Sequence, residues 1–524
     1  MRKLLIVISC LAAPAVLSAE QWQVLGTRPM GMGGAFVAVA QGPVAQYWNP
    51  GGLVKSSSNV SGMDLHAGLD AEFTGGIIKN ASDIGDMATQ LSAVQSAQTS
   101  GGSITPQQAA DFVKTMSLLA DMNKPGKGAL VEAAGGLNFK FSKLALSVNN
   151  FTAVGANPFI DTKNIGLANG TTLTGGTVPG ISFPSVSATT LTDGTYATAE
   201  TTLKTALDSL GSSAITLLCG SGSCLDSAST AITSNAQLAT AIANFAHDNS
   251  ISPDQVIAAA NTITQYAATA KPVIDAAVSG NPYTQNTSNL TLDAASFTEI
   301  AAGYAWSADK WLSGLSIGGN LKMVNGRMAT TTFQFMNNSN TGDAFKDMLK
   351  DAKSSWAPAA DIGALWDVNA KYPRLPLHPK VGVVVRNLNS PKFDRPDTVG
   401  GTYKLDRQAR MGVALKPANF WTLAADMDLT KNSTEVSGYD SRQLAFGTEI
   451  NVVNRKAFNI PLRAGLMKNV AEKSSKLAYT LGTGLNLLYM HFDVSGVISS
   501  EKTKLDDKNI PTKVGVAASF GLLF

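Results

Sequence analysis

Charged side chains are scarce in this sequence: they make up 15% of 524 residues, whereas 44% are hydrophobic. The formal net charge is only +3, and no basic run is interleaved with aromatic residues, so no nucleic-acid partner is expected. Beyond the N-terminus, no apolar run approaches the roughly 18 residues of a membrane-spanning helix. Little charge, 48 glycines and no spanning run favour a β-barrel, whose strands need only one apolar face.

Cysteine and histidine are also sparse, with three and four residues. Cys219 and Cys224 flank Gly-Ser-Gly-Ser, and a small disulfide loop is expected between them. Because no histidine or further cysteine lies nearby, we expect neither a metal site nor another cofactor. The sequence has no His-Glu-x-x-His motif, and His66 and His491 fall on the inward faces of expected strands. A polar lumen network suits them better than catalysis, so no enzyme is predicted.

The N-terminus has the pattern of a secretory signal. Arg2 and Lys3 precede an apolar run that begins at Leu4, and small residues around Ala19 are followed by Glu20-Gln-Trp. We expect cleavage after Ala19, and therefore export of the remaining chain. Cys10 would leave with this signal, residues 1–19. An alternative lipoprotein site at Cys10 is disfavoured because the apolar stretch before it is too short.

The C-terminus alternates with period two. Phe520, Leu522 and Phe524 share one face of this expected strand with three further apolar residues, and smaller residues fill the other. A strand that ends on a bare aromatic suits the closing strand of a barrel in contact with outer-membrane lipid. The barrel-assembly machinery is then an expected partner, and the outer membrane of a Gram-negative bacterium the expected location.

Period-two alternation predicts an all-β fold, an antiparallel transmembrane barrel of about 14 strands within residues 56–524. Long and short connections between these strands alternate almost without exception, as they do in outer-membrane barrels. The expected strands lie near 59–73, 129–141, 143–152, 297–307, 313–333, 358–368, 379–389, 407–416, 419–430, 441–454, 460–469, 476–487, 489–499 and 512–524.

Two long connections, residues 74–128 and 153–296, are expected to be helical inserts on the outer side. Thr105-Pro-Gln-Gln, Ser234-Asn-Ala-Gln and Ser252-Pro-Asp-Gln each have the pattern of a helix-capping box. Apolar stripes at helical spacing follow the second and third of these. The stripes are expected to bury against each other or against a partner.

Residues 20–55 are expected to form a compact, mostly uncharged plug, or hatch, inside the barrel. Gly31, Gly33 and Gly34 suit close backbone approach, with Gly33 and Gly34 too near the wall to accept a side chain. A short helix is predicted over residues 34–40, and Asn49-Pro50 marks a sharp turn.

Together these residues carry a family resemblance. Arg-x-Met-Gly-Met-Gly-Gly-Ala-Phe-Val-Ala-Val-Ala, from Arg28, and Tyr-Trp-Asn-Pro-Gly-Gly-Leu, from Tyr47, resemble the N-terminal hatch of the FadL/PorV superfamily of outer-membrane barrels. The segments 383–391 and 421–429 are similar to its branch named after plasmid-transfer TraF, which is distinct from the thioredoxin-like proteins of that name. The resemblance implies a 14-stranded barrel with a plugged lumen. It does not reach the two inserts, and Gly51 stands where FadL-like chains commonly have alanine.

Inward-facing charges of both signs are expected to form a lumen polar network. These residues either pair with one another and with the hatch, or line a substrate path; they are Glu299, Asp361, Arg386, Arg410, Asp426, Asp428, Glu449, Arg463 and Asp493.

Three functional classes follow. The TraF and PorV side of the resemblance implies a component of a conjugal-transfer or secretion apparatus, or of envelope assembly, that holds a partner protein. The FadL side implies passive transport of a small hydrophobic ligand. The third class is a surface protein whose function is carried by the helical inserts. A kinked wall and an apolar pocket beside the hatch would favour transport, whereas a closed barrel with an apolar patch on its rim would favour the apparatus.

Overall fold

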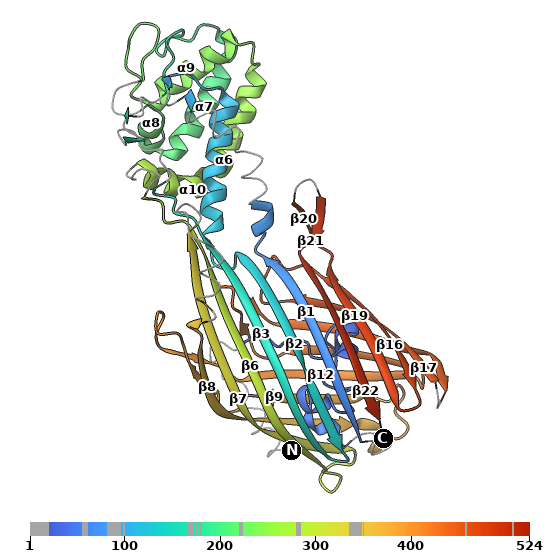
Figure 1. Cartoon of the computed structure of the whole chain (residues 1–524). Coiled ribbons are helices and arrows are strands. Elements are labelled where there is room, and N and C mark those ends of the chain that lie inside the picture. Colours follow the sequence, from blue (N-terminus) through green and yellow to red (C-terminus); the bar gives the residue numbers. More distant parts are fainter. Residues whose placement is uncertain are drawn as a thin grey trace.

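A computed structural model describes most of the chain, including all barrel strands (Figure 1). The expected signal sequence and Phe524 lie outside the described residues. These are 20–54, 61–80, 96–97, 100–164, 172–173, 176–177, 181–219, 224–278, 285–334, 348, 350–455, 458–505 and 508–523.

Fourteen antiparallel strands form one closed barrel, which confirms the predicted fold class. Each strand pairs with its neighbours along the chain, and the first and last strands pair with each other, from Gly62 opposite Leu523 to Glu72 opposite Lys513. The strands are β1 (Gly62–Thr74), β2 (Gly128–Phe141), β3 (Leu144–Phe159), β6 (Asn289–Ser307), β7 (Leu315–Gln334), β8 (Lys353–Asp367), β9 (Lys380–Arg386), β12 (Gln408–Ala418), β13 (Trp421–Asp428), β16 (Gln443–Arg455), β17 (Phe458–Asn469), β18 (Ala478–Leu487), β19 (Met490–Ser499) and β22 (Lys513–Leu523).

The outward faces of these strands are apolar and exposed, as in Leu65 and Leu69 of β1 and Val514 and Val516 of β22. Their inward faces are buried and largely polar, as in His66. Because successive side chains point to opposite faces of a sheet, this alternation is the one that the sequence predicted.

Three strands extend five or more residues beyond their expected bounds, among them β8, which begins at Lys353 rather than near residue 358. β3 continues to Phe159, and β6 begins at Asn289, so the second insert spans residues 160–288 rather than 153–296. The extensions of β3 and β6 pair with each other, from Ala153 opposite Ala295 to Phe159 opposite Asn289.

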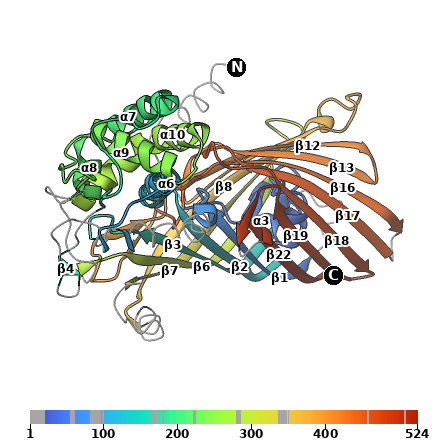
Figure 2. The same cartoon turned by 90° about the horizontal axis from the view of Figure 1, so that it is seen from above.

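The helical parts of both inserts pack into one domain at one end of the barrel (Figures 1 and 2). The first insert contributes α6 (Pro106–Met122), and the second contributes α7 (Ala197–Leu210), α8 (Ser212–Cys219), α9 (Asn235–Asp248) and α10 (Pro253–Val278). Apolar residues of all five helices share one buried core, among them Phe112, Leu203, Leu218, Leu238 and Ile263. The predicted stripes therefore bury against each other. We call this part the helical cap, and this end of the barrel the cap end.

Local signals account for the helix starts. Thr105 and Gln108 exchange side chain-to-backbone hydrogen bonds, as do Ser234 and Gln237 and also Ser252 and Gln255, so all three predicted capping boxes are complete. Cys219 and Cys224 form the predicted disulfide, which closes a small loop after α8. None of the helices in the described ranges is long and apolar enough to cross a membrane.

The N-terminal segment, residues 20–54, lies inside the barrel (Figures 1 and 2). It contains two short helices and one 3-10 turn: α2 (Thr27–Gly31), α3 (Ala45–Trp48) and η1 (Pro50–Leu53). The helix predicted over residues 34–40 is wrong. Gly33 and Gly34 adopt φ angles of 67° and 87°, and such left-handed backbone ends a right-handed helix.

Two connections at the cap end also fold inward. One carries the hairpin of β10 (Lys392–Asp394) and β11 (Thr402–Lys404), where Phe393 packs against Phe297 of the wall at 5.4 Å between ring centroids. The other, residues 429–442, carries β14 (Asn432–Ser433) and β15 (Asp440–Ser441). Its Val436 and Tyr439 pack against two residues of the wall.

Candidate functional site in the barrel lumen

The N-terminal segment meets the wall where neither side has a side chain. A Cβ atom added at Gly33 would lie 2.7 Å from the Leu466 carbonyl oxygen, and one at Gly465 of β17 would lie 2.4 Å from the Gly33 nitrogen. Gly447 of β16 is equally close to the carbonyl oxygen of Met32, at 2.4 Å. Glycines on both surfaces therefore allow backbone to approach backbone.

Gly34 differs from Gly33. Its nearest neighbour to an added Cβ would be Val24 Cγ2 at 3.8 Å, which is ordinary contact. The expectation that both glycines are pressed against the wall is wrong for Gly34, whose φ angle is what favours glycine.

The remaining predicted residues of the segment also touch the wall. Asn49 Nδ2 donates to the carbonyl of Ala364 at 3.0 Å and to that of Val37 at 3.2 Å. Its Oδ1 accepts from the Gly51 amide at 3.1 Å, which shapes the turn at Pro50. A Cβ at Gly51 would lie 3.0 Å from the Leu365 nitrogen, so glycine at this position allows the turn to lie close to β8. A Cβ at Gly31 would lie 3.2 Å from Gly482 Cα.

Eight of the nine predicted luminal charges take part in ion pairs, and all nine are buried. The pairs are Arg386–Glu299 at 2.8 Å, Arg410–Asp428 at 2.5 Å, Arg463–Glu449 at 2.8 Å, Arg463–Asp493 at 2.5 Å, and Lys322 with Glu299 at 2.8 Å and Asp361 at 3.1 Å. The structure thus brings the predicted set together and adds Lys322, a β7 residue absent from that set although alternation also turns it inward.

The ninth, Asp426, instead anchors the N-terminal segment. It accepts from the backbone amides of Phe36 and Val37 at 2.7 and 2.8 Å. A second anchor is Arg28, which binds Glu449 through two hydrogen bonds of 2.7 and 2.8 Å. Charge-assisted bonds of this kind hold the segment to β13 and β16.

An aromatic cluster of the segment covers two of the luminal arginines. The Arg386 guanidinium lies 4.1 Å from the Tyr47 ring centroid, and that of Arg410 lies 4.8 Å from the Trp22 ring. Burial raises the pKa of the Tyr47 hydroxyl, which donates to the Gln23 carbonyl at 2.7 Å. The aromatic residues could be identified in the sequence, but their pairing with arginines 339 and 388 residues away could not.

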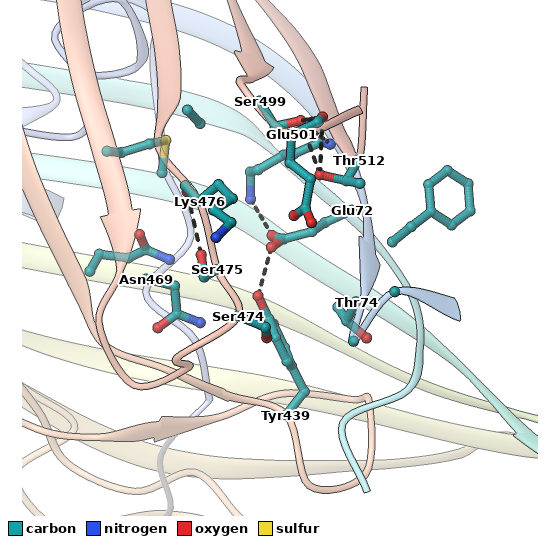
Figure 3. Close-up of a pocket in the computed structure, with 17 residues that line it drawn as sticks. Glu72, Thr74, Tyr439, Asn469, Ser474, Ser475, Lys476, Ser499, Glu501 and Thr512 are labelled. Carbon is teal, nitrogen blue, oxygen red and sulfur yellow. Dashed lines mark hydrogen bonds and ion pairs between the residues drawn. The ribbon is translucent and has the colours of Figure 1, made fainter. Parts of the chain in front are cut away.

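A small polar pocket of about 50 Å³ lies at the cap end of the lumen (Figure 3). Lys513 of β22 binds Glu72 of β1 at 2.8 Å, and Tyr439 donates to the same carboxylate at 2.7 Å. The remaining lining includes serine and threonine hydroxyls and the amide of Asn469, with Thr512 and Ser499 drawn beside Glu501. Lys513 was not predicted, although it lies on the inward face of the closing strand.

The two inward histidines join one network. His66 and His491 both lie within 4 Å of Asp64, at 3.8 and 3.6 Å. Within the described residues, no group of three or more His, Cys, Asp or Glu side chains could hold a metal ion.

One sequence pattern associated with hydrolases escaped the sequence analysis. Gly314-Leu-Ser-Ile-Gly318 matches Gly-x-Ser-x-Gly, whose serine in such enzymes sits on a sharp strand-to-helix turn. Here Ser316 lies within β7, and its hydroxyl donates to the Leu365 carbonyl of β8 at 3.1 Å. The serine therefore belongs to the wall.

Comparisons with known proteins identify one family and several similar solved structures. A family model described as "F plasmid transfer operon, TraF, protein" matches residues 46–428. No curated protein matches the sequence. Similar solved structures include the toluene transporter TodX of P. putida, with 9% identity, 97% of this chain and 99% of that one covered, and a TM-score of 0.40.

The toluene transporter TbuX of Ralstonia pickettii has 10% identity, with 95% and 98% of the chains covered and a TM-score of 0.38. A FadL homologue of Pseudomonas aeruginosa has 8% identity, 97% and 99% coverage, and a TM-score of 0.33.

Proposed function

The chain belongs to the family of the F plasmid transfer operon TraF protein, as its resemblance implied, and on this premise we propose that it is an outer-membrane scaffold of a conjugal-transfer or secretion apparatus. In this proposal the barrel anchors the protein in lipid, the N-terminal segment serves as its hatch, and exposed surfaces at its two ends hold partners. The lumen is part of the support and not a route for cargo.

The filled lumen is the observation that carries the proposal. The N-terminal segment contacts β16 and β17 backbone to backbone, and arginine–carboxylate pairs span the space around it. Removing one partner of a buried pair leaves an uncompensated charge, which costs about 3–5 kcal/mol. Movement of the segment would break the Arg28–Glu449 pair and both hydrogen bonds from the Phe36 and Val37 amides to Asp426, so it is held as a fixed part of the barrel.

The outward faces of the strands support placement in a membrane. Exposed apolar side chains occur on strands around the whole barrel, including Leu65, Ile300, Leu321, Val413 and Leu481. An apolar band of this kind would be covered by lipid.

The end opposite the cap carries exposed apolar residues in its turns, which suits a partner. Trp311 lies in the turn before β7, and Leu488 and Tyr489 form the turn before β19. Their exposed fractions are 76%, 73% and 68%, and Phe420 occupies the turn before β13. An apolar rim on a closed barrel is the feature that favours an apparatus component over a transporter.

The test is plasmid transfer from a donor strain that lacks the chain and is complemented with variants. Trp311→Ser with Leu488→Ser should reduce transfer at least about tenfold, a loss of 1.4 kcal/mol or more in partner binding. The barrel should still assemble and show heat-modifiable migration on gels. Leu65→Ser with Leu321→Ser, on the outward wall, is the matched control and should leave transfer near wild type once assembled.

The alternative, passive transport of a small hydrophobic compound, is measured in the same strains. Uptake of a monoaromatic hydrocarbon that depends on the chain, together with unchanged transfer by the rim variant, would overturn the scaffold proposal.

A further inference from the structure

Three luminal acids lie close to one another and, within the described ranges, have no arginine or lysine partner. Glu299, Asp361, Asp428, Glu449 and Asp493 each lie within 3.1 Å of an arginine or lysine nitrogen. Glu20, Glu132 and Glu435 have no such cation within ion-pair distance among the described residues. Among these residues Asp426 is also without a cation, but its carboxylate accepts two backbone amides, whereas this group of three acids lies together and lacks a positive charge.

The three carboxylates come from different parts of the fold and meet beside the start of the N-terminal segment. Glu20 pairs in a single β-bridge with Ser433, two residues before Glu435. Gln21 Nε2 donates to Glu132 Oε2 of β2 at 2.6 Å. Glu20 and Glu132 are each only 5% exposed.

One atom of this group is unsatisfied. Glu132 Oε1 is buried and has no hydrogen-bond partner in the described part of the chain. A buried carboxylate oxygen without a donor is costly, because it has lost its water and gained nothing in exchange. Burial and the nearby Glu435 and Glu132 carboxylates also raise the pKa of Glu20 well above its usual range.

We propose that the missing cation is the α-ammonium group of Glu20, released by signal cleavage, and that Glu132 Oε1 accepts its hydrogen bond. The inference rests on the predicted cleavage after Ala19. Hydrolysis of the Ala19–Glu20 amide by a signal peptidase consumes one water; Ala19 keeps the new carboxylate, and the new amine of Glu20 takes up a proton. The backbone nitrogen of Glu20 thereby gains a charge and donors next to Gln21, whose side chain already binds Glu132.

Signal cleavage and the anchoring of the N-terminal segment in the lumen are then linked. The uncleaved chain has an amide at this position, which carries no charge and offers one hydrogen. Cleavage supplies a cation that neutralises part of the acidic group and binds the start of the N-terminal segment to β2. The segment gains its last anchor only after the signal has been removed.

The direction in which the midpoint temperature shifts when the charge of Glu132 is changed tests this proposal. In the processed protein, Glu132→Gln should lower the midpoint temperature of the heat-modifiability transition by several degrees, and Glu132→Lys should lower it further by placing two cations together. If no ammonium is present, both substitutions relieve repulsion between carboxylates, and the midpoint should rise. A rise for Glu132→Lys would overturn the proposal.

Measurements on the wild-type protein test the proposal even if the Glu132 variants fail to assemble. Intact mass should place the mature N-terminus at Glu20, and a cut elsewhere would overturn the proposal. An amine-reactive isotopic label should modify the Glu20 amine at least about tenfold more slowly in the folded barrel than after heat unfolding, because a paired ammonium has a raised pKa and little free amine. Equal rates would also contradict it. Both measurements concern stability and the α-amine, so their outcome is independent of plasmid transfer.

Discussion

At the scale of single residues, glycine is required at two neighbouring positions of the N-terminal segment for different reasons. Gly33 is required by space, because its α-carbon faces carbonyl oxygens of β16 and β17. Gly34 is required by its left-handed backbone angle and not by space, since the space beside it is open. The distinction matters because a steric clash and a strained angle differ in cost.

Gly33→Ala should therefore be much more damaging than Gly34→Ala. Alanine at position 34 meets only the left-handed backbone, at a cost of about 1–2 kcal/mol. Alanine at position 33 has that cost and also places a methyl group 2.7 Å from the Leu466 oxygen, so the segment or the wall must shift. The midpoint of heat-modifiable migration measures both, and equal midpoints would contradict the close contact.

Glu435, in the inward-folded connection 429–442, should make that connection sensitive to pH. Burial raises the pKa of its carboxyl from 4.5 to about 7, although Tyr403, which donates to it at 3.0 Å, acts in the opposite direction. The folded state thus holds this proton more tightly than the unfolded state does. The connection is most stable below about pH 4.5 and loses stability as the pH rises through 7.

Limited proteolysis of the 429–442 connection should therefore be faster at pH 8 than at pH 5. Glu435→Gln removes the titrating group and should reduce that difference, after correction for the pH dependence of the protease. If Glu435→Gln shows a difference between pH 8 and pH 5 as large as that of the wild type, the effect belongs to another group.

At the scale of elements, local pattern predicted most of the fold. Alternation located all 14 barrel strands, since the lipid-facing side of each strand repeats every second residue. It missed the extensions of β3 and β6, where Gly155, Asn157 and Pro158 have the composition of a loop. Capping boxes located the helix starts, but the packing of α6 on α10 joins segments some 150 residues apart, and no local signal carries that contact.

The joined core of the helical cap can be tested separately from the barrel. Phe112 of α6 is 2% exposed within that core, and Phe112→Ala should cost about 3–5 kcal/mol there. We expect faster proteolysis of the cap with unchanged heat-modifiable migration of the barrel. Gln107→Ala, at an exposed position of α6, is the control, and simultaneous loss of cap and barrel would show that the two do not fold as separate cores.

At the scale of the whole molecule, the barrel and its contents depend on each other. The wall supplies glycines and paired charges to the N-terminal segment, and the segment fills the space that the strands enclose. The inward charges could be predicted from alternation, but their partners could not, because Arg410–Asp428 depends on the register of two strands and Arg386–Glu299 joins strands that are not neighbours. Lys322 and Lys513 were not predicted, although alternation turns both of them inward.

The most direct test of the account is ion conductance in planar bilayers. Wild-type protein should be nearly silent, because residues 20–54 occupy the lumen. Gly33→Leu, once assembled, should displace the segment from β16 and β17 and conduct, whereas Gly34→Ala should remain nearly silent. A wild-type barrel that conducts as well as Gly33→Leu would contradict the claim that this segment closes the lumen.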